Sequence, residues 1–253
     1  MFVIKIESLN NKLIKLVSSL KMKKARDKEE LFFAEGERNV SDGIKKASAE
    51  MIFISEGYKG NKDFPCKTYE VSDGVFKKIS DTETPQGILG VFKKKEGSLS
   101  DIKGNAVILN GVRDPGNMGT IIRCAKAAGF DTIICDKTCT DIYSPKTVRA
   151  AMSGIFGLNA VVSENLFEDI RKLKDMGYEI IAADMDGESS FKAKLKFPLA
   201  LILGNEANGI DEEILKASDR IISIPMNGEI ESLNVAVAGS VLMFEAARQL
   251  TEK

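Results

Sequence analysis

Short apolar runs alternate with amphipathic stretches along most of the chain. In the second half, Ala106–Asn110 and Leu199–Leu203 are almost wholly apolar, which is typical of parallel strands buried on both faces. Ser144 followed by Pro145 has the pattern of a helix start, with Ser as N-cap and Pro at the first helical position. The pattern predicts an α/β fold whose parallel sheet is covered on both faces and binds ligands at the carboxyl ends of its strands.

The remaining elements of the second half follow from the same periodicities. We expect strands at Thr132–Cys135, Asn159–Val162, Glu179–Ala183 and Arg220–Ile224, and helices over Thr120–Ala128, Leu166–Met176, a short stretch from Asp211, and Val235–Leu250. The last helix is apolar on most faces, so we expect it to be deeply buried and to form a subunit interface.

The first half has the pattern of a smaller α/β domain. We expect helices over Asn11–Leu20, Glu37–Ala47 and Ser72–Ile79, and strands at Leu31–Ala34, Met51–Ser55 and Gly87–Phe92. The polar, charged stretch Lys93–Asp101 separates two segments of different texture. We therefore place a domain boundary near residue 97, with domains at 1–96 and 97–253.

The composition excludes several classes of chemistry. The chain has no histidine, which removes the commonest general base and every Ser-His or Cys-His nucleophile. It has neither a G-x-G-x-x-G loop nor a Walker A sequence, which argues against a dinucleotide site and a P-loop ATPase. Four cysteines without paired spacing predict a reducing cytoplasm and no metal centre. With no apolar run near the roughly 18–20 residues of a membrane span and no signal peptide pattern, we expect no membrane association.

The charge of the whole chain does not indicate a nucleic-acid partner, since the net charge is −1 and the pI about 5.8. Its distribution is more informative, because residues 1–28 contain eight Lys or Arg side chains against two acidic ones. Such runs are more often solvated faces than binding surfaces. Contact with RNA phosphates is the alternative that we keep for this cluster.

Three polar loops follow predicted strands, where ligands of such sheets bind. Asn110–Arg123 is rich in Gly and carries Asn117 and Arg123, and Leu201–Ile210 places Glu206 directly after an apolar strand. Ile222–Gly239 leads from a third strand to Ser232 and Asn234 at a helix start. Each loop also has a purely structural interpretation, in which Asp114 or Asn117, Glu206, and Ser232 or Asn234 only cap the following turn or helix.

The three loops together carry a specific resemblance. Their sequences N-G-V-R-D-P-G-N-M-G-T-I-I-R, L-I-L-G-N-E-A-N-G-I and I-P-M-N-G-E-I-E-S-L-N-V-A-V-A closely resemble the three motifs of the SpoU family, RNA 2′-O-ribose methyltransferases of the SPOUT superfamily. The match covers about residues 104–250. Residues 5–92 resemble, more weakly, the substrate-binding domain of two-domain members, which is similar to a small RNA-binding ribosomal protein. The resemblance implies an α/β knot fold with a C-terminal trefoil knot, S-adenosylmethionine as cofactor and a homodimer.

The resemblance also assigns roles to individual residues. It implies catalytic roles for Asn117, Arg123, Glu206, Ser232 and Asn234. It implies cofactor contacts for Leu203, Gly204, Ile224, Met226 and Leu233. Ala207 and Ala236 depart from the family pattern, which often has Gly and Ser there; neither change removes a catalytic group, though Ala207 affects how tightly the cofactor loop closes.

As a literal base, Arg123 would face a pKa of roughly 12.5–13.8, or about 7–9 kcal/mol against deprotonation at neutral pH. We therefore expect Arg123 to orient the ribose hydroxyl and to stabilise the developing alkoxide. Asn117 is expected to hold Arg123 or the ribose, and Glu206 to fix a neighbouring loop.

For RNA contacts we expect a basic set in the first domain together with one arginine of the second: Lys21, Lys23, Lys24, Arg26 and Arg149. For Arg149 a solvated helix face is the favoured alternative. Ribosomal RNA is the first candidate substrate and transfer RNA the second. Two other hypotheses remain. A non-catalytic RNA-binding protein on this scaffold is disfavoured by the intact catalytic set. Methylation of a base is disfavoured by the Ser-Leu-Asn form of the third motif.

Overall fold

The computed structural model describes residues 3–227 and 232–252. The chain forms two compact units, one comprising residues up to Lys94 together with Asp141–Gly157, the other Lys95–Thr140 together with the residues from Leu158 onward. The division at Lys94 lies close to the expected boundary. Unlike the sequence-based expectation, however, the segment Asp141–Gly157 groups with the first unit. No helix of the described residues is long and apolar enough to cross a membrane.

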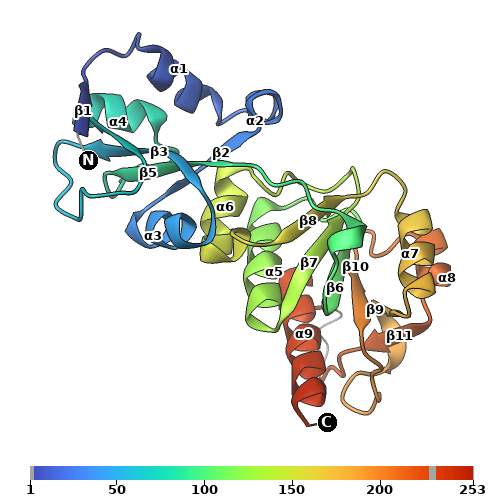
Figure 1. Cartoon of the computed structure of the whole chain (residues 1–253). Helices are drawn as coiled ribbons and strands as arrows, with labels where there is room; N and C mark the ends of the chain where they lie inside the picture. The colour runs from blue at the N-terminus through green and yellow to red at the C-terminus, as the bar shows by residue number, and fades with distance from the viewer. Residues whose placement is uncertain (1–2, 228–231, 253) are drawn as a thin grey trace. The chain divides into compact units, whose positions relative to one another are not determined.

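The first unit is built on a five-stranded mixed sheet with the order β1-β4-β3-β5-β2 (Figure 1). Strands β1, β4 and β3 are parallel, whereas β5 is antiparallel to both of its neighbours. Its elements are β1 (Val3–Ile6), α1 (Lys12–Ser19), α2 (Lys23–Glu29), β2 (Leu31–Glu35), α3 (Glu37–Lys46), β3 (Ala49–Ser55), β4 (Lys67–Val71), α4 (Asp73–Ile79), β5 (Ile88–Lys93), α6 (Pro145–Ala151) and the 3-10 turn η2 (Met152–Ile155).

Aromatic packing and one buried ion pair hold the segment Asp141–Gly157 in the first unit. The ring of Phe32 lies 4.8 Å from that of Tyr143, and Phe92 meets Phe156 edge-on at 4.8 Å. Arg26 is 3% exposed and donates two hydrogen bonds to Asp141 Oδ2, at 3.0 and 2.6 Å. Contacts between residues so distant in sequence leave no trace in local periodicity. The sequence pattern therefore gave no reason to assign this segment to a different domain from its neighbours in the chain.

The structure corrects the expectation for Arg26 as an RNA-binding residue. Besides its pair with Asp141, the guanidinium donates to the carbonyl oxygens of Leu20 and Lys21, so its charge is inside the unit. Lys21 is also engaged, because its ammonium group donates to the carbonyls of Lys78 and Ser80. Lys23 and Lys24 are exposed on α2. Of the basic cluster, these two therefore offer the free charges.

The second unit contains a six-stranded sheet with the order β11-β9-β10-β6-β7-β8, in which every neighbouring pair is parallel. Its elements are the 3-10 turn η1 (Leu99–Asp101), β6 (Asn105–Leu109), α5 (Pro115–Ala127), β7 (Phe130–Cys135), β8 (Asn159–Val162), α7 (Leu166–Asp175), β9 (Glu179–Ser189), β10 (Leu199–Leu203), α8 (Glu212–Ala217), β11 (Arg220–Ser223) and α9 (Val235–Thr251).

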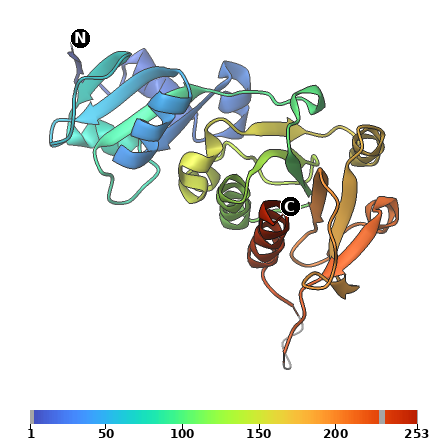
Figure 2. The same cartoon turned by 60° about the horizontal axis from the view of Figure 1, so that its bottom comes forward.

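Helices cover both faces of this sheet (Figures 1 and 2). Alternate residues of each strand point to opposite faces, so Ile108 and Ile202 pack with Ile170 of α7 and Ile214 of α8. On the other face α5 and α9 lie side by side. The predicted parallel α/β fold is confirmed, because both layers bury the continuous apolar strands seen in the sequence.

Two elements differ from the sequence-based expectation in ways that affect the site. Helix α5 begins at Pro115 rather than Thr120, because Asp114 is its N-cap and accepts a hydrogen bond of 2.8 Å from Asn117 N–H. Asn117 therefore lies within the first helical turn. Strand β9 continues to Ser189 instead of ending at Ala183. The sequence also did not predict β1, α2 or β4, which are short and weakly patterned.

We predict that Arg26→Ala lowers the free energy of unfolding of the first unit by about 3–5 kcal/mol, because it leaves Asp141 largely buried without its partner. Three of the four tyrosines, Tyr58, Tyr69 and Tyr143, lie in this unit, so urea unfolding followed by tyrosine fluorescence reports mainly on it. Arg171→Ala removes a guanidinium from an exposed pair with Glu168 and serves as the control, expected to change stability by about 0.5 kcal/mol or less. Equal effects of the two changes would contradict the buried-pair account.

Candidate active site

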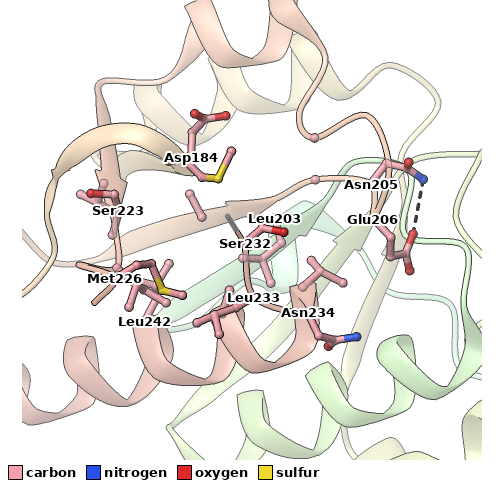
Figure 3. Close-up of a pocket in the computed structure, with 18 of the residues that line it drawn as sticks. Asp184, Leu203, Asn205, Glu206, Ser223, Met226, Ser232, Leu233, Asn234 and Leu242 are labelled. Atoms are coloured by element: carbon pink, nitrogen blue, oxygen red, sulfur yellow. Dashed lines mark hydrogen bonds between the residues drawn. The ribbon is translucent and has the colours of Figure 1, made fainter. Parts of the chain in front are cut away.

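A cavity of about 740 Å³ lies beside the carboxyl ends of β10 and β11 in the second unit (Figure 3). Its walls come from β9, from the loop after β10, from the loop after β11 and from the start of α9. In the view of Figure 3, Asn205, Glu206 and Asn234 lie at one end and Ser223, Met226 and Leu242 at the other. The cavity is thus polar at one end and more apolar at the other.

An irregularity in β9 forms one wall. Ala182 pairs with Ile221 of β11, but the next paired residue of β9 is Glu188, opposite Ile222. The intervening residues 183–187 have no counterpart in β11 and bulge from the ladder. Three of them, Ala183–Met185, line the cavity.

Two glycines allow backbones to approach closely at the opposite wall. A Cβ on Gly204 would lie only 2.3 Å from the carbonyl carbon of Gly209, so the loop after β10 folds back on itself only with Gly there. A Cβ on Gly239 would lie 2.4 Å from Leu203 Cδ1, so α9 packs directly against the end of β10. A larger residue at position 204 would clash with backbone atoms and push the loop open, whereas at position 239 the Leu203 side chain would have to move.

Glu206 joins the loop after β10 to the loop after β6. Its carboxylate accepts hydrogen bonds from the backbone N–H groups of Arg113 (3.4 Å) and Asp114 (3.2 Å) and from Asn117 Nδ2 (3.0 Å). Partial burial by itself would raise the pKa of Glu206, but the hydrogen bonds from Asn117 and from backbone N–H groups outweigh it and leave the pKa below its ordinary value. Glu206 is therefore ionised and acts purely as an acceptor at neutral pH.

Asn117 extends this contact to the third loop. Its Oδ1 accepts a hydrogen bond of 2.9 Å from Asn234 Nδ2, while Asn234 Oδ1 accepts from the N–H groups of Ala236 and Val237 at 2.9 and 3.3 Å. Asn234 is thus the N-cap of α9, which agrees with its structural interpretation, and it is also a hydrogen-bond partner of Asn117. The hydrogen-bond chain Glu206–Asn117–Asn234 connects all three polar loops.

Asn205 stiffens the loop that carries Glu206. Its Nδ2 donates to the carbonyl of Gly111 at 2.7 Å and to Glu206 at 3.4 Å, the bond drawn in Figure 3. Its Oδ1 accepts from the N–H groups of Ala207 and Asn208. The side chain therefore ties the loop after β10 both to itself and to the loop after β6.

The structure brings together most residues that the sequence singled out. Those lining the cavity are Leu203, Gly204, Glu206, Ile224, Met226, Ser232, Leu233 and Asn234. Asn117 reaches it through its hydrogen bonds. Arg123 is not among the lining residues; it is exposed on α5 and, six residues after Asn117, about 120° around the helix from it. No hydrogen bond joins Asn117 to Arg123 within the described part of the chain.

Sequence reasoning missed several lining residues, among them Asp184, Met185, Asn205, Ser223 and Leu242. Asp184 and Met185 lie in β9 beyond the point where the strand was expected to end. The rule that ligands sit at the carboxyl ends of parallel strands, applied to the A-A-D-M-D-G segment, could have found them. Leu242 lies two turns into α9, and only the packing of that helix shows that it reaches the cavity.

The cavity suits a ligand that combines an uncharged aromatic base and ribose with a separate positively charged group. Its volume falls within the range of small-molecule sites. Leu203, Ile224 and Leu233 offer apolar contact, and the only ionisable lining side chains among the described residues are Asp184 and Glu206, both acidic. S-adenosylmethionine, with its adenine, ribose and sulfonium cation, fits this lining. The described residues contain no cluster of three or more potential metal ligands.

We predict that Glu206→Gln destabilises the second unit by about 1–3 kcal/mol at pH 7, because an amide NH₂ would face N–H donors. Since the pKa of Glu206 is lowered on folding, its contribution is complete above about pH 5 and is lost as the pH falls through the lowered pKa. The difference in Tm between wild type and variant should therefore be constant from pH 5 to 8 and shrink below about pH 4. A difference that grows on acidification would contradict the assignment.

Comparison with known proteins places this site in a family. Residues 104–244 match the model of the SpoU rRNA Methylase family, and residues 11–90 match that of the MRM3-like substrate binding domain. The chain is 32% identical over 243 residues to 23S rRNA (guanosine(2553)-2′-O)-methyltransferase RlmP of Bacillus subtilis, covering 94% of this chain and 97% of that protein. It is also 32% identical over 180 residues to 23S rRNA (guanosine-2′-O-)-methyltransferase RlmB of Ralstonia nicotianae, covering 68% of this chain and 72% of that one.

A solved structure leads to the same family assignment. An AdoMet-bound rRNA methyltransferase from Sinorhizobium meliloti superposes with a TM-score of 0.85 at 31% identity, covering 98% of each chain. The match of the family model to more than half of the chain confirms the resemblance inferred from the three motifs. The chain belongs to the SpoU rRNA methylase family.

Proposed function

We propose that this protein transfers a methyl group from S-adenosylmethionine to the 2′-hydroxyl of a guanosine ribose in large-subunit ribosomal RNA. The observation that carries the proposal is the hydrogen-bond chain Glu206–Asn117–Asn234, which joins the three motif loops at the polar end of the cavity. The names of two relatives, both 23S rRNA guanosine 2′-O-methyltransferases, support the acceptor.

In this proposal the cofactor is held by the apolar and backbone groups of the loops after β10 and β11: Leu203, Gly204, Ile224, Met226 and Leu233. S-adenosylmethionine would supply a methyl group activated by its sulfonium, and the residues around the cavity would contribute most by positioning the acceptor hydroxyl. Asn117 and Asn234 each donate only one hydrogen bond from their amide nitrogens within the described chain. The second N–H of each is available to orient the ribose. Ser232, at the cavity wall, is a further donor.

Arg123 orients the ribose hydroxyl and stabilises the charge that develops on it. Its guanidinium makes no ion pair with the described residues, which leaves its donors for RNA. Its place on α5, away from the cavity of its own protomer, is compatible with this role if the helix lies at a subunit interface.

A homodimer formed through α9 meets that requirement. Val237 and Phe244, seven residues apart on α9, are 48% and 50% exposed, so one face of this helix carries two large apolar side chains that the rest of the protomer does not cover. Helix α5, which carries Arg123, lies beside α9 (Figure 1). Pairing of this face with a second copy would cover both apolar side chains and bring Arg123 to the interface.

The RNA-binding role of the first unit rests on Lys23, Lys24 and Arg149. The two lysines are exposed on α2, and the side chain of Arg149 is 46% exposed while it pairs with Asp81 at 3.2 Å. Lys21 supports the same region by holding α2 to the end of α4. We further propose that the protein acts in the cytoplasm, which the four free cysteines and a ribosomal RNA substrate support.

We predict that the purified protein transfers tritium from methyl-labelled S-adenosylmethionine to unmodified large-subunit rRNA, and that the label is recovered in alkali-resistant dinucleotides, as ribose methylation requires. Arg123→Ala should lower kcat by about 100-fold or more, since an oriented donor to a developing oxyanion is worth about 2.7–4 kcal/mol. Arg123→Lys should recover only a small part of it, because Lys lacks the planar fork. Full activity of Arg123→Lys, or label in transfer RNA alone, would contradict the proposal.

We predict that wild type sediments as a dimer at micromolar concentration and that Phe244→Lys shifts it to monomer, because a charge would be buried at the interface. Met176→Lys changes an equally exposed apolar side chain outside α9 and should leave the dimer intact. An active wild-type monomer would rule out the subunit interface proposed for α9.

A further inference from the structure

The ion pairing of the arginines singles out three of them. The chain has eight, and five pair with carboxylates: Arg26, Arg149, Arg171, Arg220 and Arg248. The other three, Arg38, Arg113 and Arg123, have no carboxylate partner among the described residues. A guanidinium without a protein partner is available to an anionic ligand, which it can bind with a planar fork of donors.

Arg113 differs from the other two in its place beside the cavity. It lies in the loop between β6 and α5, and its backbone N–H donates to Glu206 Oε2 at 3.4 Å. The next N–H, of Asp114, donates to the other oxygen of the same carboxylate at 3.2 Å. Its backbone is therefore fixed by the residue that also holds Asn117, while its side chain is exposed.

The charge of the cavity shows why a cation is needed there. Asp184 and Glu206 are the ionisable lining residues in the described part of the chain, and neither is basic. An RNA acceptor carries a phosphate on each side of the ribose whose hydroxyl reacts. Acidic side chains repel that phosphate unless a cation lies between them. On the loops that meet at the polar end, the described residues include one cation, Arg113, whereas Arg123 lies further along α5.

We infer that Arg113 binds a backbone phosphate next to the acceptor ribose and so places the RNA strand over the cavity. The inference rests on the proposed function and adds a substrate-binding residue to it. Because phosphate contacts fix register and orientation without reading bases, Arg113 determines how tightly RNA binds rather than which nucleotide is chosen. Its contribution differs from that of Arg123, whose guanidinium is assigned to the reacting hydroxyl.

The test compares Arg113→Ala, Arg113→Lys and the control Arg171→Ala, which removes the same charge from an exposed helix pair on α7. With an unmodified large-subunit rRNA fragment, Arg113→Ala should raise the KM for RNA about tenfold, because one hydrogen-bonded charge is lost. The kcat should stay within about twofold of the wild-type value. The slope of log K for RNA against log salt, from filter binding, should become shallower by about 0.7–0.9. Arg113→Lys should keep the slope and recover part of the affinity.

Cofactor binding separates this role from a structural one. The Kd for S-adenosylmethionine, from calorimetry, should be the same in all four proteins, because only the backbone of Arg113 contacts Glu206. A fall in cofactor affinity that matches the fall in RNA affinity, or RNA binding by Arg113→Ala equal to the control, would overturn the inference. If wild type methylates no RNA, the proposed function fails, and the salt dependence of RNA binding still decides the role of Arg113.

Discussion

The structure of the site depends on one short hydrogen-bond chain, from Glu206 through Asn117 to Asn234. Its two links join residues 89 and 117 positions apart in sequence. The two amides have one complementary orientation in this chain, because an ionised Glu206 can only accept and the N-cap role of Asn234 uses its oxygen. Three loops that are separate in sequence thereby become one rigid frame.

This frame couples the cofactor cavity to the acceptor position. Asn234 begins α9, and α9 supplies Leu242 to the cavity and Gly239 to the contact with Leu203. Glu206 holds the backbone at Arg113 and Asp114, where α5 begins. Movement of a loop on binding one ligand would therefore also change the binding site of the other ligand. RNA binding and cofactor binding thus favour the same arrangement of the three loops.

How much the sequence could predict depended on the range of the interactions. Strands such as Leu199–Leu203 were predicted with correct bounds because burial on both faces leaves a continuous apolar run. The bulge in β9 and the burial of Arg26 depend on partners far along the chain, Ile222 and Asp141, which no local pattern reveals. The motifs identified Asn117, Glu206 and Asn234 but not that they bond to one another. The trefoil knot stays a prediction of the family resemblance.

A double-mutant cycle on Asn117 and Asn234 tests the hydrogen-bond chain most directly. The free energy of unfolding would be measured for wild type, Asn117→Ala, Asn234→Ala and the double variant. If the two side chains act as one unit, the double variant loses less than the sum of the single losses, by about 0.5–3 kcal/mol. Losses that add to within about 0.3 kcal/mol would show that the loops are held independently and would contradict the account.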